Sequence, residues 1–120
     1  MEINGKDYGL LLTVAAASDI AKGCPGENFD KLNEALFSPS IPESNNAIIN
    51  MVCALSHGYE ARRTFDEPGY TPAPLTRELL STLSMLELWQ LRGEAIQAFN
   101  AGLNTTVKVD DSKKNENPGG

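Results

Sequence analysis

The 120-residue sequence has few of the side chains on which catalysis and metal binding depend. It holds one histidine, His57, and two cysteines, Cys24 and Cys53. The lack of a second histidine argues strongly against a histidine-based metal site. Two cysteines so far apart in sequence also make neither a disulfide framework nor a zinc site. We therefore expect two reduced thiols in an intracellular protein.

Long apolar runs and an excess of basic residues are missing as well. The longest apolar run, Leu10 to Ala17, is too short to span a bilayer. Glu2, Lys6 and Asp7 interrupt the N-terminus before it, so we expect no signal peptide. The net charge of −6 argues against binding to nucleic-acid phosphates or to an anionic membrane. The sequence predicts a soluble, cytoplasmic protein whose overall charge attracts basic partners.

The strongest pattern that is present lies in the middle of the chain, from Asn45 to Thr64. Apolar residues recur there at intervals of three and four on one helical face: Ile48, Val52, Leu55 and Tyr59. Further apolar residues widen this face to nearly half of the circumference, so neighbours must pack against it on more than one side. We predict that this helix is the packing spine of the molecule.

Shorter elements are predicted on both sides of the spine. Asn4-Gly5 predicts the turn of a small β-hairpin whose second arm runs from Asp7 to Thr13. Two short helices are expected before the spine, over residues 14–22 and 28–37, and Ser38 to Pro42 is expected to break the chain between them and the spine. Two more are expected after it, over residues 76–83 and 84–103, the second starting at a Ser84/Glu87 capping box.

The predicted fold class is therefore mainly α. We expect about five helices around a central long helix, with a short N-terminal β-hairpin. This helical domain covers residues 1–103. Residues 104–120 are predicted to form a disordered polar tail because they can bury almost nothing.

Four aromatic side chains are candidate anchors for a protein partner, because aromatic residues dominate interface hot spots. They are Phe65, Tyr70, Trp89 and Phe99. For Trp89 and Phe99 the alternative to an interface is a position in the core, since both fall on the apolar face of the last helix. That predicted face is formed by Leu88, Trp89, Arg92, Ile96, Phe99 and Leu103. Tyr70 lies in the proline-rich loop 66–74, where the core and an interface are equally open to it.

No catalytic, metal-binding or cofactor-binding residues are expected. Cys53 and His57 are spaced i, i+4, so a nucleophile–base pair is geometrically conceivable. However, Cys53 lies in the middle of an apolar helix face, where nothing lowers the pKa of a thiol. The acidic residues are scattered at spacings that fit neither a metal loop nor an acid–base pair.

Short segments spread over most of the chain carry a resemblance to a known family. They are Ile3-Asn4-Gly5-Lys6-Asp7-Tyr8, Leu12-Thr13-Val14, Ile48-Ile49, Leu55-Ser56-His57-Gly58-Tyr59-Glu60, Leu75-Thr76-Arg77-Glu78-Leu79-Leu80, Glu87-Leu88 and Ala95-Ile96-Gln97-Ala98-Phe99-Asn100-Ala101-Gly102. In these segments and in its layout the sequence resembles the tail assembly chaperones of long-tailed phages and prophages of Gram-positive hosts.

The resemblance implies a mostly helical, non-enzymatic protein of the host cytoplasm. Such a protein coats the tape measure protein, recruits tail tube subunits, associates with itself and is absent from the mature virion. Many members are also made as a longer frameshifted product, and Lys113-Lys114-Asn115 is compatible with an A-rich slippery run. The competing interpretation is a small acidic helical module of regulatory or antitoxin-like type.

Overall fold

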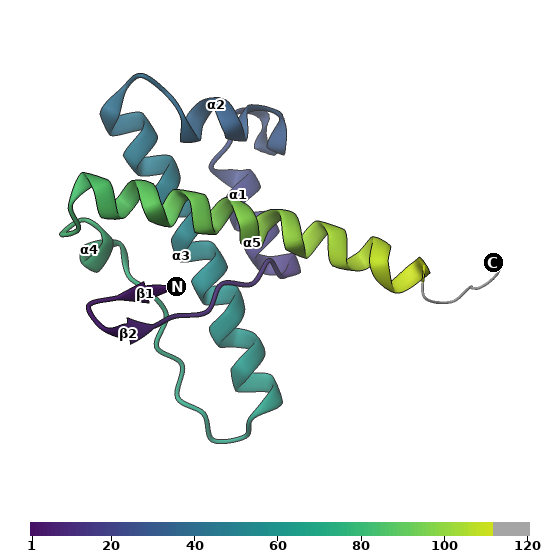
Figure 1. Cartoon of the computed structure of the whole chain (residues 1–120). Coiled ribbons are helices and arrows are strands. Elements are labelled where there is room, and N and C mark those ends of the chain that lie inside the picture. The colour runs from purple at the N-terminus through teal and green to yellow at the C-terminus, as the bar shows by residue number, and fades with distance from the viewer. Residues whose placement is uncertain (112–120) are drawn as a thin grey trace.

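A long central helix organises the molecule. The computed structural model describes residues 1–111, and the side chains of residues 1–104. Helix α3, Ile41–Asp66, runs through the middle of the molecule (Figure 1). The predicted spine is confirmed but begins four residues earlier, because Ser40 caps the helix by accepting a hydrogen bond from the Glu43 N–H. The proline at position 42 does not break the chain there, since the first turn of a helix tolerates proline.

The N-terminal β-hairpin is confirmed, although it is shorter than predicted. Strands β1 (Glu2–Ile3) and β2 (Lys6–Asp7) pair antiparallel. Asn4 and Gly5 join them with φ values of 53° and 79°, and two positive φ angles are what a type I′ turn requires.

The predicted second arm of the hairpin, up to Thr13, is wrong beyond Asp7. Residues 8–13 are extended but form no strand, and they run along α3. The Leu11 N–H donates to the Leu55 carbonyl of that helix, at 3.0 Å. The backbone of this segment thus bonds to a helix, although its alternating pattern suggests pairing within a sheet.

Two short helices precede α3. Helix α1, Val14–Lys22, has the predicted bounds and begins at the Thr13 cap. The single helix predicted over residues 28–37 is instead divided: two 3₁₀ turns, η1 (Pro25–Glu27) and η2 (Phe29–Lys31), lead into α2, Leu32–Leu36.

Two helices follow α3. Helix α4, Arg77–Leu80, is shorter than the predicted 76–83, and Thr76 caps its start. Helix α5, Met85–Asp111, begins at the predicted capping box: the Glu87 N–H donates to Ser84 Oγ and the Ser84 N–H donates to Glu87 Oε1. It crosses α3 and extends away from the other helices towards the C-terminus (Figure 1).

The predicted start of the disordered tail at residue 104 falls inside α5, which continues to Asp111. Residues 112–120 of that predicted tail lie outside the described residues.

The hydrophobic core lies where α1, α2 and α5 pack on α3. Among the most deeply buried side chains are Leu36, Ile48, Met51, Val52, Leu55, Leu75, Leu80 and Ala95. The fold is mainly α, as predicted: a few short helices and one long crossing helix surround the central one.

Candidate protein-binding surface

The four predicted aromatic anchors have very different environments. Phe65, in the last turn of α3, is 84% exposed, and Trp89, near the start of α5, is 43% exposed. Phe99 is only 8% exposed and Tyr70 is half-buried. Of these four, Phe65 therefore presents most of its surface to a partner, and Trp89 presents a little under half.

Phe99 occupies the core position that was its alternative. Its ring makes an edge-to-face contact with Phe29, with ring centroids 5.0 Å apart. The predicted apolar face of the last helix is displaced accordingly. Its buried residues are Leu88, Leu91, Ala95 and Phe99, while Leu103 and Trp89 are exposed.

Tyr70 is held by a buried carboxylate of α3, that of Glu60. The Tyr70 hydroxyl donates to Glu60 Oε1 at 2.6 Å, and the Ala73 N–H donates to the same oxygen at 2.8 Å. The Arg63 guanidinium lies over the Tyr70 ring at 4.0 Å and forms a bidentate pair with Glu67. Tyr70 therefore fixes the loop between α3 and α4 and is not a free anchor.

These contacts change the acidity of the groups involved. Burial raises the pKa of the Glu60 carboxyl, but the hydrogen bonds from Ala73 and Tyr70 and the positive charge of Arg63 outweigh it, so that the pKa lies below its ordinary value. The same hydrogen bond raises the pKa of the Tyr70 hydroxyl. The hydrogen bonds from Arg63 lower the pKa of Glu67.

Trp89 belongs to a surface cluster that the sequence did not reveal. The Arg92 guanidinium carbon lies 4.2 Å from the centroid of the Phe37 ring and 5.9 Å from that of Trp89. Phe37 is 55% exposed. We call Phe37, Trp89 and Arg92 the aromatic–arginine patch.

The end of α2 positions this patch. Phe37 follows the last residue of α2, and its N–H donates to the Asn33 carbonyl. The Leu36 carbonyl, which a helix end leaves without an internal partner, accepts hydrogen bonds from Ser44 Oγ of α3 at 2.8 Å and from Arg92 Nη1 of α5 at 3.3 Å. One carbonyl thus joins three helices and helps to hold Arg92 near both rings.

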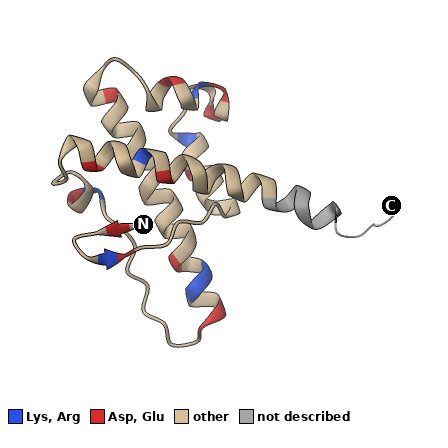
Figure 2. Cartoon of the chain, viewed as in Figure 1, with Lys and Arg blue, Asp and Glu red and all other residues tan. Residues whose placement is uncertain are grey.

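Within the part of the chain that the structure describes, the patch carries an arginine without an acidic partner. In Figure 2 the described part of α5 has one basic segment, and Arg92 is its only Lys or Arg up to Asn104. No carboxylate forms an ion pair with Arg92 among the described residues, whereas Lys31, Arg62 and Arg63 each have one. Beyond its bond to Leu36, the guanidinium has further N–H donors available.

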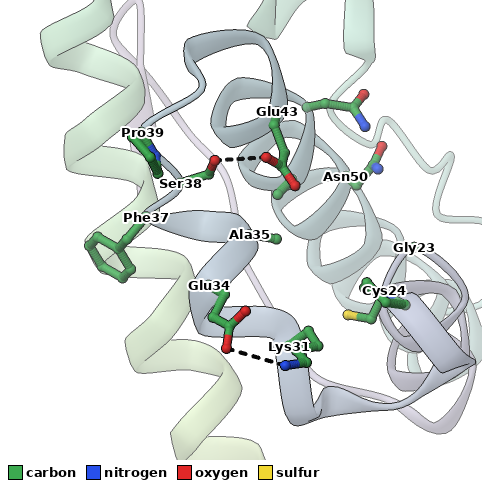
Figure 3. Close-up of a pocket in the computed structure, with 13 residues that line it drawn as sticks. Gly23, Cys24, Lys31, Glu34, Ala35, Phe37, Ser38, Pro39, Glu43 and Asn50 are labelled. Atoms are coloured by element: carbon green, nitrogen blue, oxygen red, sulfur yellow. Dashed lines mark hydrogen bonds and ion pairs between the residues drawn. The ribbon is translucent and has the colours of Figure 1, made fainter.

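The largest concavity near the patch is an open groove of about 860 Å³ between α2 and the first half of α3. Figure 3 shows Phe37 at its edge. The two carboxylates in the groove are engaged: Glu34 pairs with Lys31 at 3.5 Å, and Glu43 accepts from Ser38 Oγ at 2.7 Å. The groove is therefore a depression in the surface beside the patch, and no reactive groups converge in it.

Cys53 and His57 do not form the conceivable nucleophile–base pair. No hydrogen bond joins them in the described part of the chain. Burial raises the pKa of the Cys53 thiol, and its side chain packs against the core as expected, while His57 is exposed. Within residues 1–104, no three His, Cys, Asp or Glu side chains are grouped so that they could hold a metal ion.

Sequence reasoning missed Phe37, Arg92 and Glu60 as important residues. Phe37 falls within the helix predicted over residues 28–37, Arg92 is on the predicted apolar face of the last helix, and Glu60 is one of the scattered acidic residues. A partial signal exists for Phe37, because it directly precedes the helix-breaking Ser38-Pro39 and so lies where a helix face ends.

Comparison of the chain with protein-family models, curated proteins and solved structures finds no match. In the described residues, no helix combines the length and apolar character needed to cross a membrane.

Proposed function

We propose that this chain is a non-enzymatic, helical protein-binding module that acts as a tail assembly chaperone of a long-tailed phage or prophage of a Gram-positive host. In this role it binds the tape measure protein in the host cytoplasm, recruits tail tube subunits and is absent from the finished virion. A longer frameshifted product would extend the chain beyond its present C-terminus. The tape measure protein and the tail tube subunits are proposed as partners because the short segments of the chain resemble that family.

The observation that carries the binding role is the aromatic–arginine patch. Aromatic and arginine side chains are the residue types enriched at the energetic centres of protein interfaces. Here two aromatic rings and an arginine lie together on the surface, with more than 40% of each ring residue exposed. Trp89 and Arg92 lie on α5, and Phe37 directly follows α2 with its N–H bonded to the Asn33 carbonyl, so a partner has little to order on binding.

A chaperone that coats a long partner needs contacts between its own copies, and Phe65 supports this part of the proposal. The patch lies beside Ser44 in the first turn of α3, whereas Phe65 lies in its last turn. At 1.5 Å per residue these points are about 30 Å apart along the helix. One molecule can therefore bind a partner at one end of α3 and another copy at the other.

The experiment is co-expression of the full chain with an affinity-tagged fragment of the tape measure protein encoded beside it. Stable co-purification is the expected result. If neither that fragment nor any other segment of the tape measure protein binds, the proposal is overturned, and a regulatory module with a different partner is favoured.

A further inference from the structure

We infer that the aromatic–arginine patch is a docking site for a partner segment that presents a carboxylate flanked by apolar side chains. This inference rests on the proposed protein-binding function and adds the chemistry of the partner. Its core is the Arg92 guanidinium, which lies against Phe37 and near Trp89 and lacks an ion pair in the described chain.

The geometry of Arg92 favours a carboxylate over other polar groups. The guanidinium is a planar fork whose parallel N–H groups match the two oxygens of a carboxylate. One N–H is taken by the Leu36 carbonyl, which fixes the position of the group. The Phe37 ring covers part of the guanidinium, and a charged hydrogen bond is stronger where water is scarce.

The exposed rings define the apolar part of the partner. Phe37 and Trp89 are 55% and 43% exposed, and Leu86, one turn before Trp89 on α5, is 64% exposed. Apolar side chains on either side of the partner carboxylate would cover these surfaces and exclude water from the ion pair. An amphipathic helix with one acidic residue on its apolar face has this arrangement.

A second copy of the chain is a poorer occupant. Two copies that meet through the same patch around a twofold axis would bring one Arg92 close to the other. The two carboxylates of the groove beside Phe37 are engaged: Glu34 with Lys31 and Glu43 with Ser38. They offer no free carboxylate to a symmetry-related arginine.

The overall charge of the chain does not conflict with an acidic contact. The net charge of −6 acts over the whole surface and steers basic proteins towards the molecule. Arg92 acts only at contact, where a single carboxylate of a partner that is basic overall determines how long the complex lasts.

The test uses two synthetic helical peptides that differ in one residue. Both carry leucines along one face and lysines and alanines elsewhere; one has a glutamate among the leucines and its twin has a glutamine. Trp89 is the only tryptophan of the chain, so its fluorescence reports binding at the patch directly. We expect the glutamate peptide to bind about tenfold more tightly than its twin.

Variants of the full chain separate the patch from the rest of the surface. Arg92→Gln is expected to remove the difference between the two peptides, and Arg92→Lys to restore only part of it. Phe37→Ala should weaken both peptides. Leu103→Ala changes an apolar residue of α5 outside the patch that is about as exposed as Trp89, 49% against 43%, and it should leave both affinities unchanged. Unchanged far-UV circular dichroism confirms that each variant is folded.

Equal affinities for the two peptides, or no Trp89 response to either at millimolar concentration, would overturn the inference. A fluorescence change that depends on protein concentration alone would also overturn it and identify a second copy as the occupant. If the tape measure fragment binds and Arg92→Gln leaves that binding unchanged, the inference fails while the proposed function stands. If the fragment does not bind but the glutamate peptide does, the proposed function fails while the docking site stands.

Discussion

At the scale of single residues, Glu60 is the side chain on which the loop before α4 depends. Its buried carboxylate accepts hydrogen bonds from the Tyr70 hydroxyl and the Ala73 N–H. Glu60→Gln retains a carbonyl oxygen but loses the charge, so we expect the free energy of unfolding to fall by about 1–3 kcal/mol. Urea denaturation measures this. Glu78→Gln, an exposed change on α4, should stay within about 0.5 kcal/mol of the original protein.

The same carboxylate makes stability depend on pH in a defined direction. The pKa of Glu60 is lower in the folded state than in the unfolded chain, so the folded state favours the charged form. Its contribution is complete above the unfolded pKa of about 4.3 and is lost as the pH falls through the folded pKa. The stability difference between the original protein and Glu60→Gln should therefore shrink as the pH is lowered from 7 through this range. A difference that grew on acidification would contradict the hydrogen-bond network.

Trp89 and Phe99 make a matched pair of aromatic residues on one helix. Phe99 is 8% exposed and packs on Phe29, so Phe99→Ala should destabilise the protein by about 3–5 kcal/mol. Trp89 is 43% exposed, and Trp89→Ala should cost much less while leaving the helical circular dichroism signal intact. Thermal unfolding of the two variants checks this order, and a larger loss for Trp89→Ala would place that residue in the core.

At the scale of secondary-structure elements, two helical glycines lead to opposite expectations. A β-carbon on Gly58 of α3 would collide with the Leu11 carbonyl and the Thr13 side chain, whereas nothing lies within 4 Å of one on Gly93 of α5. Gly93→Ala should therefore stabilise the protein by up to about 1 kcal/mol, the difference in helix propensity. Gly58→Ala should destabilise it, because Leu11 would have to leave its bond to Leu55. Chemical denaturation of both variants separates local propensity from packing.

The elements that the sequence predicted well are those whose signals are local. The Asn4-Gly5 turn, the bounds of α1 and the Ser84/Glu87 box depend on residues close together in the chain. The second hairpin arm was mispredicted because an alternating pattern records only which side chains are half-buried. It does not show whether the backbone pairs with a strand or, as Leu11 does, with a helix.

At the scale of the whole molecule, the same limit explains what the sequence showed of the surface. Phe65 and Trp89 were recognisable as candidate anchors by residue type alone. The patch itself required the fold, since Arg92 and Leu36 are 56 residues apart when they form their hydrogen bond. Tyr70 and Glu60 likewise meet only because the loop after α3 folds back on that helix.

The separation of the two exposed aromatic sites along α3 gives a prediction about assembly. If Phe65 mediates contacts between copies, Phe65→Ala should reduce the oligomer size measured by light scattering, with the helical signal unchanged. Trp89→Ala should leave that size unchanged, since we assign the patch to another partner. A wild-type chain that stays monomeric at high concentration would contradict the role of Phe65.

The extended segment of residues 8–13 has a consequence for how the protein is made. Leu11 bonds to α3, and Leu12 lies against Gly102 of α5, so the segment fits between an early and a late part of the chain. On a ribosome that adds about 5–20 residues per second, these leucines emerge several seconds before Gly102 exists. The first apolar segment to be synthesised must wait for the last helix before it is covered. A nascent chain that stalls before α5 is complete therefore exposes an apolar N-terminal segment to the chaperones of the cell that makes it.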